Sequence, residues 1–252
     1  MTKVRLEARD AGVRLLTLTD PGRRNAMGDE MGQQLRAAAG EVAADPAARA
    51  LVVTGAGSAF CAGADLPAMF GDADRPVTDT HAYLQGYYQA FLALRELAIP
   101  TIAAVNGPAV GAGLNLAMAC GVRIAGRDAA FGATFARIGL HPGGGCTHFL
   151  VEAIGPSRAL RTLLLGDTLD AERDVAWGLA DGPEDDPLEA ALELAGLFAK
   201  VEPQLARHIT KAVRLAATTH DLDAVLEYES WAQAASAASP ALQAWVERFR
   251  KD

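Results

Sequence analysis

Apolar and polar residues alternate along the first twenty positions of the chain. Segments 4–9 and 13–19 each switch between apolar and polar side chains, and the tripeptide 10–12, which ends in glycine, separates them. Alternation is typical of a strand with one buried face, and a short glycine-containing link allows the chain to reverse direction. The pattern therefore predicts an antiparallel hairpin at the start of the chain.

A helical period replaces the alternation between residues 29 and 44. Apolar residues recur there three or four positions apart, at Met31, Leu35, Ala38 and Val42. This spacing places them on one face of a helix, and Pro46 predicts where the helix has ended. The segment is therefore predicted to be an amphipathic helix.

Two short apolar runs, 50–54 and 101–105, stand on either side of a longer helical segment at about 80–97. Such runs predict strands buried on both faces, which is typical of parallel strands joined by helices. The carboxyl ends of parallel strands lie at one edge of a sheet, where α/β proteins bind their ligands. We therefore expect the turns that follow the two runs to meet. Segment 70–79, rich in aspartate and proline, is expected to form a mobile flap over this edge.

Both turns are rich in glycine and alanine. Residues 61–66 read Cys-Ala-Gly-Ala-Asp-Leu, and residues 106–115 read Asn-Gly-Pro-Ala-Val-Gly-Ala-Gly-Leu-Asn. Small residues allow a ligand to approach the main chain closely, and rigidly held N–H groups stabilise negative charge on a carbonyl oxygen. The two turns are therefore interpreted as an oxyanion hole.

Beyond residue 156 the chain is predicted to be helical almost throughout, over segments 157–165, 171–177, 187–200, 204–216, 222–235 and 241–251. Several of these helices carry wide apolar faces that include Tyr228, Trp231, Trp245 and Phe249. Such faces need to be covered by the chain's own core or by another subunit. We therefore divide the chain into a core of residues 1–195 and a C-terminal helical region of residues 196–252.

Composition limits the partners that the chain can have. Its 252 residues are 50% hydrophobic and 21% charged, which is enough to bury a sizeable core. A formal net charge of −8 and the absence of a lysine or arginine run argue against nucleic acid or an anionic membrane as a partner. The first ten residues lack the apolar stretch of a secretory signal, so we expect a cytoplasmic protein. Segment 102–120 is uncharged, but Asn106, Pro108 and Asn115 interrupt it and argue against a membrane helix.

The cysteines indicate neither a disulfide framework nor a metal site. Cys61, Cys120 and Cys146 are odd in number and far apart, and they do not show the spacing of metal ligands. Free cysteines of this kind are commonly small core residues. We therefore expect no bound metal and a reducing compartment.

Several phrases occur in a fixed order along the chain: residues 23–27, 55–66, 104–113, 131–133 and 138–147. Together they resemble the crotonase superfamily, also called the enoyl-CoA hydratase/isomerase family, over nearly the whole chain. The resemblance implies an α/β fold, a spiral of ββα units with a helical C-terminal region that mediates trimerisation. It also implies an acyl-CoA thioester as the ligand and a homotrimer or a dimer of trimers. Coenzyme A is then part of the substrate, and no separate cofactor is expected.

The same resemblance assigns roles to individual residues. The N–H groups of Ala64 and Ala112 would stabilise the thioester oxygen, aided by the start of a helix near residue 113. Further substrate-binding positions, several of them near the adenine and phosphates, would be Arg24, Ala26, Ala62, Asp65, Leu66, Pro108 and Phe135. Asp65 also precedes an apolar helical segment, and for this aspartate we favour the role of a helix cap.

Hydratases of this family use two glutamates that bracket the double bond of the substrate. The corresponding positions here hold Asn115 and Phe135, and Gly143 occupies the place where other relatives carry a single acid. An amide, a phenyl ring and a hydrogen atom cannot transfer protons at neutral pH. True hydratase activity is therefore not expected.

Two residues remain as candidates for the missing chemistry. His141 has the intrinsic pKa of an acid–base group, but it could instead hydrogen-bond a loop carbonyl. Asn115 could fix a water molecule or a polar acyl substituent, or it could satisfy buried backbone groups. Two hypotheses follow: an acyl-CoA enzyme that stabilises an enolate or oxyanion with atypical catalytic residues, or a non-catalytic acyl-CoA binding or carrier protein.

Overall fold

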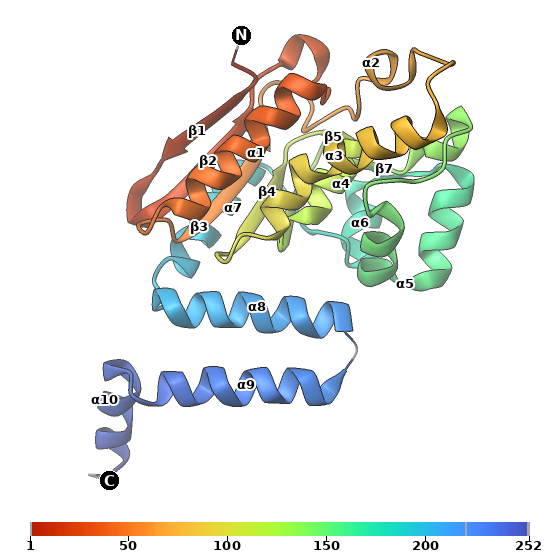
Figure 1. Ribbon diagram of the computed structural model, residues 1–252. Coiled ribbons are helices and arrows are strands. Elements are labelled where there is room, and N and C mark those ends of the chain that lie inside the picture. Colours follow the sequence, from red (N-terminus) through yellow and green to blue (C-terminus); the bar gives the residue numbers. More distant parts are fainter. Residues whose placement is uncertain (1, 220, 251–252) are drawn as a thin grey trace. The chain divides into compact units, whose positions relative to one another are not determined.

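The computed structural model describes residues 2–219 and 221–250, and the chain divides into two compact units, Met1–Lys200 and Val201–Asp252. The main sheet of the first unit has the strand order β1-β2-β3-β4-β6-β9, and Figure 1 labels its first four strands. These strands are β1 (Val4–Ala8), β2 (Val13–Leu18), β3 (Ala50–Gly55), β4 (Thr101–Val105), β6 (Val122–Gly126) and β9 (Asp181–Glu184). β1 and β2 are antiparallel, which confirms the predicted hairpin, and the other pairs are parallel.

The chain enters a second, smaller sheet directly after β4. Its strands are β5 (Pro108–Val110), β7 (Ala130–Gly132) and β8 (Thr168–Asp170), with β7 in the middle. β5 follows β4 after two residues and is parallel to β7. The second glycine-rich turn is therefore partly a strand, and the short sheet anchors it.

Helices cover both faces of the main sheet (Figure 1). α1 (Asp29–Ala44) packs against α3 (Val77–Arg95) on one side, and α7 (Pro187–Phe198) packs on β3 and β4 from the other. Leu51 and Val53 of β3 belong to the larger core, whereas Ala50 and Val52 belong to the core under α7. Because successive residues of a strand face opposite sides, this division explains why the run is apolar throughout.

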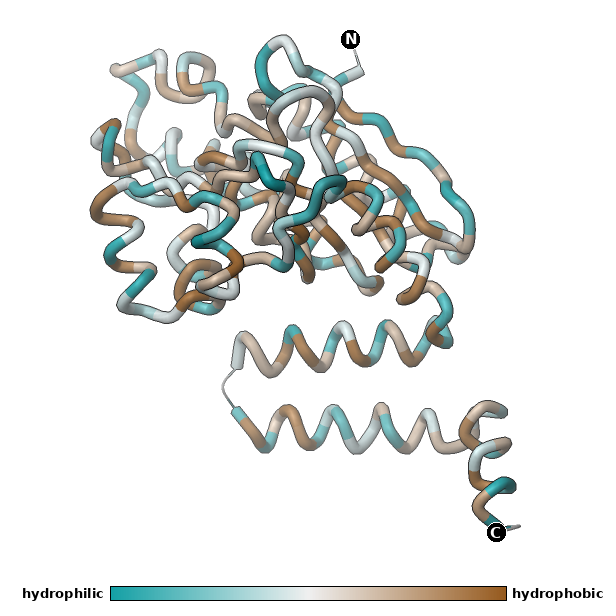
Figure 2. The backbone as a smooth tube through the Cα atoms, turned by 180° about the vertical axis from the view of Figure 1, so that it is seen from behind, coloured by the Kyte–Doolittle hydropathy of each residue, from teal (hydrophilic) through white to brown (hydrophobic). Residues whose placement is uncertain are grey.

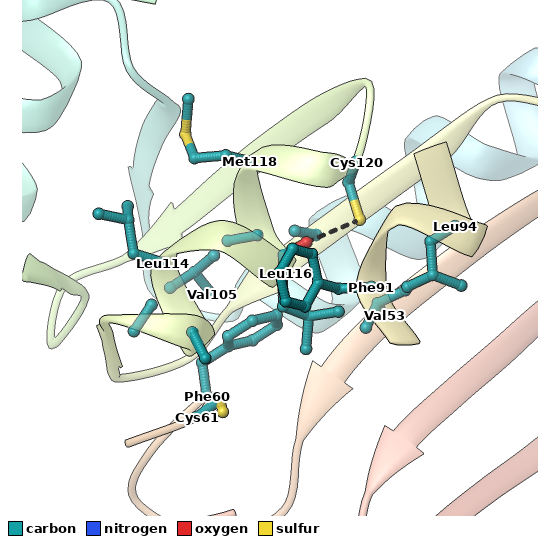
Figure 3. Close-up of a cluster of buried hydrophobic side chains, with 14 of the residues drawn as sticks. Val53, Phe60, Cys61, Phe91, Leu94, Val105, Leu114, Leu116, Met118 and Cys120 are labelled. Atoms are coloured by element: carbon teal, nitrogen blue, oxygen red, sulfur yellow. Dashed lines mark hydrogen bonds between the residues drawn. The ribbon is translucent and has the colours of Figure 1, made fainter. Parts of the chain in front are cut away.

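The centre of the larger core is α4 (Ala112–Ala119), whose residues are all buried. Figure 3 shows its side chains packed among Val53, Phe60 and Phe91. Cys120 donates a weak hydrogen bond to the carbonyl oxygen of Leu116, at 3.7 Å. A helix buried on all sides holds its first turn rigidly, and this turn carries one of the two expected donors.

The three cysteines are free and buried, as expected. Burial raises the pKa of Cys61, Cys120 and Cys146 to about 12. A buried thiol that stays protonated is not a nucleophile. The cysteines therefore pack the core and contribute no covalent chemistry.

The remaining elements of the first unit are short or kinked. They are η1 (Asp10–Gly12), η2 (Pro21–Arg23), α2 (Leu66–Phe70), η3 (Thr134–Ile138), α5 (Cys146–Leu165) and α6 (Ala171–Trp177). The expected flap over 70–79 is shorter than predicted, because α2 ends at Phe70 and α3 begins at Val77. Arg75 lies between them, stacked over the ring of Tyr83 and hydrogen-bonded to the carbonyl oxygen of Met69.

The second unit consists of α8 (Pro203–Thr219), α9 (Leu222–Ala237) and α10 (Pro240–Phe249). His208 and Tyr228 join α8 to α9, with 2.9 Å between the Nδ1 and hydroxyl atoms. Brown apolar positions recur along α8 and α9 in Figure 2, and Trp231 and Phe249 are 70% and 74% exposed. The predicted apolar faces are thus confirmed. The last helix was predicted to extend to residue 251, which lies outside the described residues.

Across residues 2–219 and 221–250, every helix is too short or too polar to traverse a lipid bilayer.

Candidate active site

A cavity of about 320 Å³ lies beside the two glycine-rich turns. Its wall is largely apolar and draws on α2, α3, the start of α4, η3 and the loop after η3. The lining residues are Ala62, Gly63, Ala64, Leu66, Met69, Phe70, Leu84, Tyr87, Tyr88, Phe91, Val110, Gly111, Ala112, Asn115, Thr134, Phe135, Ile138, Leu140, His141, Pro142 and Gly143. Among the described residues the wall contains no carboxylate, lysine or arginine. Concave, mostly apolar sites with a few polar groups are typical of ligand pockets.

The first turn is held against residue 27 by main-chain bonds. The N–H of Met27 donates to the carbonyl oxygen of Gly63 at 2.7 Å, and the N–H of Asp65 donates to the carbonyl oxygen of Met27 at 3.1 Å. In this parallel bridge the peptide groups on either side of Ala64 bind Met27, so the N–H of Ala64 points away from it. Ala64 also lines the cavity.

Main-chain hydrogen bonds join the second turn to the first. The N–H of Cys61 donates to the carbonyl oxygen of Pro108 at 3.1 Å, and the N–H of Val110 donates to the carbonyl oxygen of Cys61 at 3.0 Å. A Cβ placed on Gly113 would overlap the carbonyl oxygen of Cys61, and one on Gly63 would lie 2.7 Å from that of Val110. Only glycine permits this close approach.

The second expected donor is at the start of α4. Ala112 is the first residue of that helix, and the left-handed φ of +55° that the turn requires falls on Gly111. The first N–H groups of a helix have no partner within the helix and carry the positive end of its dipole. Within residues 2–219 and 221–250, the N–H groups of Ala64 and Ala112 donate to no protein acceptor. Both residues line the same cavity.

Asn25 holds the loop that leads into the first turn. It is fully buried with a left-handed φ of +57°, and its Nδ2 donates to the carbonyl oxygens of Ala56 and Ala59 at 2.9 Å. A third carbonyl, that of Phe60, lies at 3.2 Å, and Oδ1 accepts the N–H of Asp20. The side-chain amide of Asn25 thus binds both ends of residues 56–60, the loop that leads into the first turn.

We expect Asn25→Ala to lower the free energy of unfolding by about 3 kcal/mol, because buried carbonyls lose their donor and alanine is strained at this φ. Urea denaturation measures the loss. Asn25→Gly is the matched control. Glycine adopts the left-handed conformation freely, so this variant loses the hydrogen bonds without the backbone strain. A loss below about 1 kcal/mol for the alanine variant would contradict this role.

The structure places the residues expected to bind substrate in two groups. Ala62, Leu66 and Phe135 line the cavity, whereas Arg24, Ala26, Asp65 and Pro108 do not. Arg24 is exposed, and its carbonyl oxygen accepts the N–H of Ala62 at 2.9 Å. The residues outside the cavity therefore adjoin the first turn or, in the case of Pro108, the second.

Asp65 caps α2, as predicted. Its side chain accepts the N–H of Ala68 at 3.5 Å and pairs with Arg23 at 2.8 Å. The hydrogen bond from Arg23 lowers the pKa of this carboxyl group. Asp65 is therefore an ionised, engaged group and not a proton donor at neutral pH.

Asn115, Phe135 and Gly143, where the resemblance leads us to expect the family's acids, all line the cavity. Nδ2 of Asn115 donates to the carbonyl oxygen of Gly143 at 2.8 Å. Phe135 lies near Gly111, where an added Cβ would be 3.8 Å from the ring. Asn115 therefore binds a partly buried carbonyl of a neighbouring loop, and this contact is compatible with both hypotheses for its role. Its other atom, Oδ1, is buried without a partner in the described part of the chain.

His141 is exposed and lines the cavity. Its Nδ1 lies 2.8 Å from the carbonyl oxygen of Pro142. Because a carbonyl oxygen only accepts, Nδ1 must carry the proton in this contact, which leaves Nε2 with a free lone pair. The loop-carbonyl bond and a role as a base are thus compatible in one tautomer.

From the sequence, Tyr87 and Tyr88 are possible hydrogen-bond donors to an acyl group, but packing is the more usual role of such a pair, and no residue of α3 was assigned to the site. Leu84, Tyr87, Tyr88 and Phe91 all line the cavity. Their spacing of three or four residues is a signal for one face of a helix, but that spacing alone is equally typical of core packing. Tyr87 does support the site, because its hydroxyl donates to the carbonyl oxygen of Met27 at 3.0 Å.

Comparisons with known proteins point to one family. Residues 8–251 match the family described as enoyl-CoA hydratase/isomerase. The chain is 49% identical over 214 residues to a Mycobacterium tuberculosis protein named "Probable enoyl-CoA hydratase echA14", covering 85% of this chain and 82% of that protein. It is 37% identical over 223 residues to the 1,2-epoxyphenylacetyl-CoA isomerase of Escherichia coli, covering 87% and 85%.

A solved structure extends the likeness to the fold. The enoyl-CoA hydratase of Bacillus anthracis superposes with a TM-score of 0.89 at 27% identity, and the match covers 98% of this chain and 97% of that one. The mixed α/β architecture and the helical C-terminal region are thus those of the crotonase fold. The chain belongs to the enoyl-CoA hydratase/isomerase family, that is, to the crotonase superfamily.

Proposed function

We propose that the cavity binds the acyl end of an acyl-CoA thioester, and that the N–H groups of Ala64 and Ala112 stabilise an enolate or other oxyanion there. The observation that carries this proposal is that both N–H groups lack a protein acceptor within the described residues and belong to residues of one cavity wall. Preorganised donors in a site shielded from water stabilise developing negative charge strongly. The thioester oxygen is where that charge develops.

The reaction is one that does not require two carboxylates. The cavity wall contains no acid among the described residues, so proton transfer falls to Nε2 of His141 or to a water molecule held by Asn115. Enolate chemistry with a single base serves isomerases and lyases. The relatives bear both hydratase and isomerase names, so those names do not decide the reaction.

The same observation favours a second candidate. A cavity with donors but without an acid or base of proven function could hold an acyl-CoA without changing it. The alternative function is therefore a non-catalytic acyl-CoA carrier. It shares the binding mode and differs only in the absence of turnover.

Coenzyme A is proposed to lie along the outer side of the first turn, near Arg24, Ala26 and Asp65. Arg24 is exposed, and its carbonyl oxygen accepts the N–H of Ala62, which lines the cavity. The exposed apolar faces of α8, α9 and α10 support assembly into a homotrimer or a dimer of trimers, in which another subunit covers them. We place the protein in the cytoplasm, with no separate cofactor.

The test is calorimetric binding and turnover with a panel of enoyl-CoA, β-oxoacyl-CoA and saturated acyl-CoA thioesters. We expect each class to bind more tightly than free coenzyme A, and at least one class to give product. Binding without product from any member would favour the carrier. No gain in affinity from the acyl group would overturn both candidates.

A further inference from the structure

The loop that carries His141 has little stiffness of its own. It spans residues 139–145, connects η3 to α5 and contains four glycines in seven residues. Gly139, Gly144 and Gly145 have left-handed φ angles of +71°, +65° and +86°. Glycine restricts the backbone least, so such a segment is ordered only by contacts with its neighbours. The place of His141 in the cavity wall therefore depends on what holds this loop.

One peptide group of the loop is held at both ends. The carbonyl oxygen of Gly143 accepts a hydrogen bond from Nδ2 of Asn115 at 2.8 Å, and the N–H of Gly144 belongs to the same peptide group. That N–H interacts with the hydroxyl of Tyr88, where burial raises the pKa and the N–H opposes the rise. Because a trans peptide group is planar and its C=O and N–H point in opposite directions, Asn115 and Tyr88 fix its orientation from two sides.

The two side chains that hold this peptide group come from two packed helices. Tyr88 belongs to α3 and Asn115 to α4, and these helices contact each other in the larger core. Asn115 is 2% exposed on a helix whose residues are all buried. A Cβ on Gly143 would overlap the hydroxyl of Tyr88, and a Cβ on Gly144 would lie 2.6 Å from Nδ2 of Asn115. The loop is thus tied closely to a rigid part of the molecule.

The held peptide group is next to the one that orients the imidazole. The carbonyl oxygen of Pro142, which directly precedes Gly143, lies 2.8 Å from Nδ1 of His141. This contact needs the proton on Nδ1 and leaves Nε2 able to accept one. Without the contacts to Asn115 and Tyr88, the neighbouring glycines would let the Pro142 carbonyl move, and the imidazole with it.

We propose that His141 is the base of this cavity and that Asn115 and Tyr88 are its positioning residues. This inference rests on the proposed function and chooses between the two bases that it allows. Nε2 of His141 takes a proton from the α carbon of the thioester, and the electron pair of that C–H bond moves onto the thioester oxygen. The N–H groups of Ala64 and Ala112 stabilise the resulting enolate. In heavy water the imidazolium exchanges its proton with the solvent and returns deuterium to the enolate.

The test measures deuterium incorporation into 3-butenoyl-CoA in heavy water by mass spectrometry, because the double bond of this thioester acidifies its α protons. We expect the unchanged protein to catalyse incorporation, and His141→Ala to lower kcat at least about 100-fold, the usual effect of removing a general base. Tyr88→Phe and Asn115→Leu should each lower kcat about tenfold and leave KM within about twofold, since they displace the base and keep the oxyanion donors. Tyr88→Phe removes a single oxygen atom, so it carries this test if Asn115→Leu does not fold.

Rescue by free imidazole separates positioning from a direct role of Asn115. We expect added imidazole to restore exchange in His141→Ala, and to restore it equally in the double variant that also carries Asn115→Leu. A free base does not need the loop, so the second substitution then has nothing left to displace. A smaller rescue in the double variant would show that Asn115 acts on the substrate or on water itself, and the inference would fail.

Tyr83→Phe is the matched control. Tyr83 is also on α3, but its hydroxyl donates to Asp29 at 2.6 Å, and it is not among the described residues that line the cavity. We expect this variant to keep the full exchange rate. Exchange that survives His141→Ala would overturn the inference and leave the proposed function intact.

Two further outcomes are distinguished by calorimetric binding of 3-butenoyl-CoA. Binding without deuterium incorporation would overturn the inference and favour the carrier. If 3-butenoyl-CoA bound no more tightly than free coenzyme A, the proposed function itself would be wrong.

Discussion

Ala112→Pro is expected to lower turnover of the substrate identified in the panel by about 100- to 1000-fold, the usual effect of removing one oxyanion donor. The position suits this test, because Ala112 is the first residue of α4. Proline is favoured at the first position of a helix, where its missing N–H breaks no intrahelical bond. The substitution therefore removes the donor without removing the helix. Steady-state kinetics measure the loss, and circular dichroism checks the fold.

Ala112→Gly is the control for this experiment. It removes the methyl group and keeps the N–H, so we expect turnover within about tenfold of the unchanged protein, since glycine is only modestly less favourable than alanine in a helix. Should the proline variant fold normally and retain full activity and affinity, Ala112 is not a donor. Equal losses in both variants would point to packing instead of the N–H.

Hydration of crotonyl-CoA is expected to be slower than about 0.1 per second, at least 100-fold below an ordinary enzyme turnover of about 10 per second. Each missing general acid or base costs about 100- to 10,000-fold, and the prediction rests on the expectation that Asn115 and Phe135 occupy the two glutamate positions. Loss of the ultraviolet absorbance of the enoyl thioester measures the rate.

A family hydratase with both glutamates, assayed in the same buffer, provides the reference rate. The expected outcome is normal hydration by the reference and none above background here. Turnover of about 10 per second by this chain would show that another group replaces the glutamates. His141 would then be the first residue to substitute, because its Nε2 is free.

The elements with a clear local signal were predicted well. α1 spans residues 29–44 in both the prediction and the structure, because its apolar period is regular and Pro46 follows. β4 was likewise predicted without error. The predicted start of α5 was wrong. The helix was expected to begin at residue 157, but it begins at Cys146 and continues through a kink at Gly155. Gly155 and Pro156 normally interrupt a helix, and here the chain resumes it directly.

The smaller sheet and the polar side of the cavity could not be predicted in the same way. β5, β7 and β8 have three residues each, too few to show a period. Tyr88, Asn115 and Gly143 meet only through tertiary packing, across more than fifty positions of sequence. The two glycine-rich turns were recognisable because small residues in a fixed order are a local signal, whereas the cavity beside them depends on long-range contacts.

The junction between the two turns has a consequence for how such a protein can change. Cys61 and Val110 are linked through peptide groups alone, and glycine at position 113 is required where the chains touch. Side-chain replacements outside Gly63 and Gly113 therefore leave the contact between the two turns intact, while the opposite wall of the cavity consists of side chains that can vary. Under the proposed function, changes in that wall would alter the reaction while the two N–H donors keep their positions.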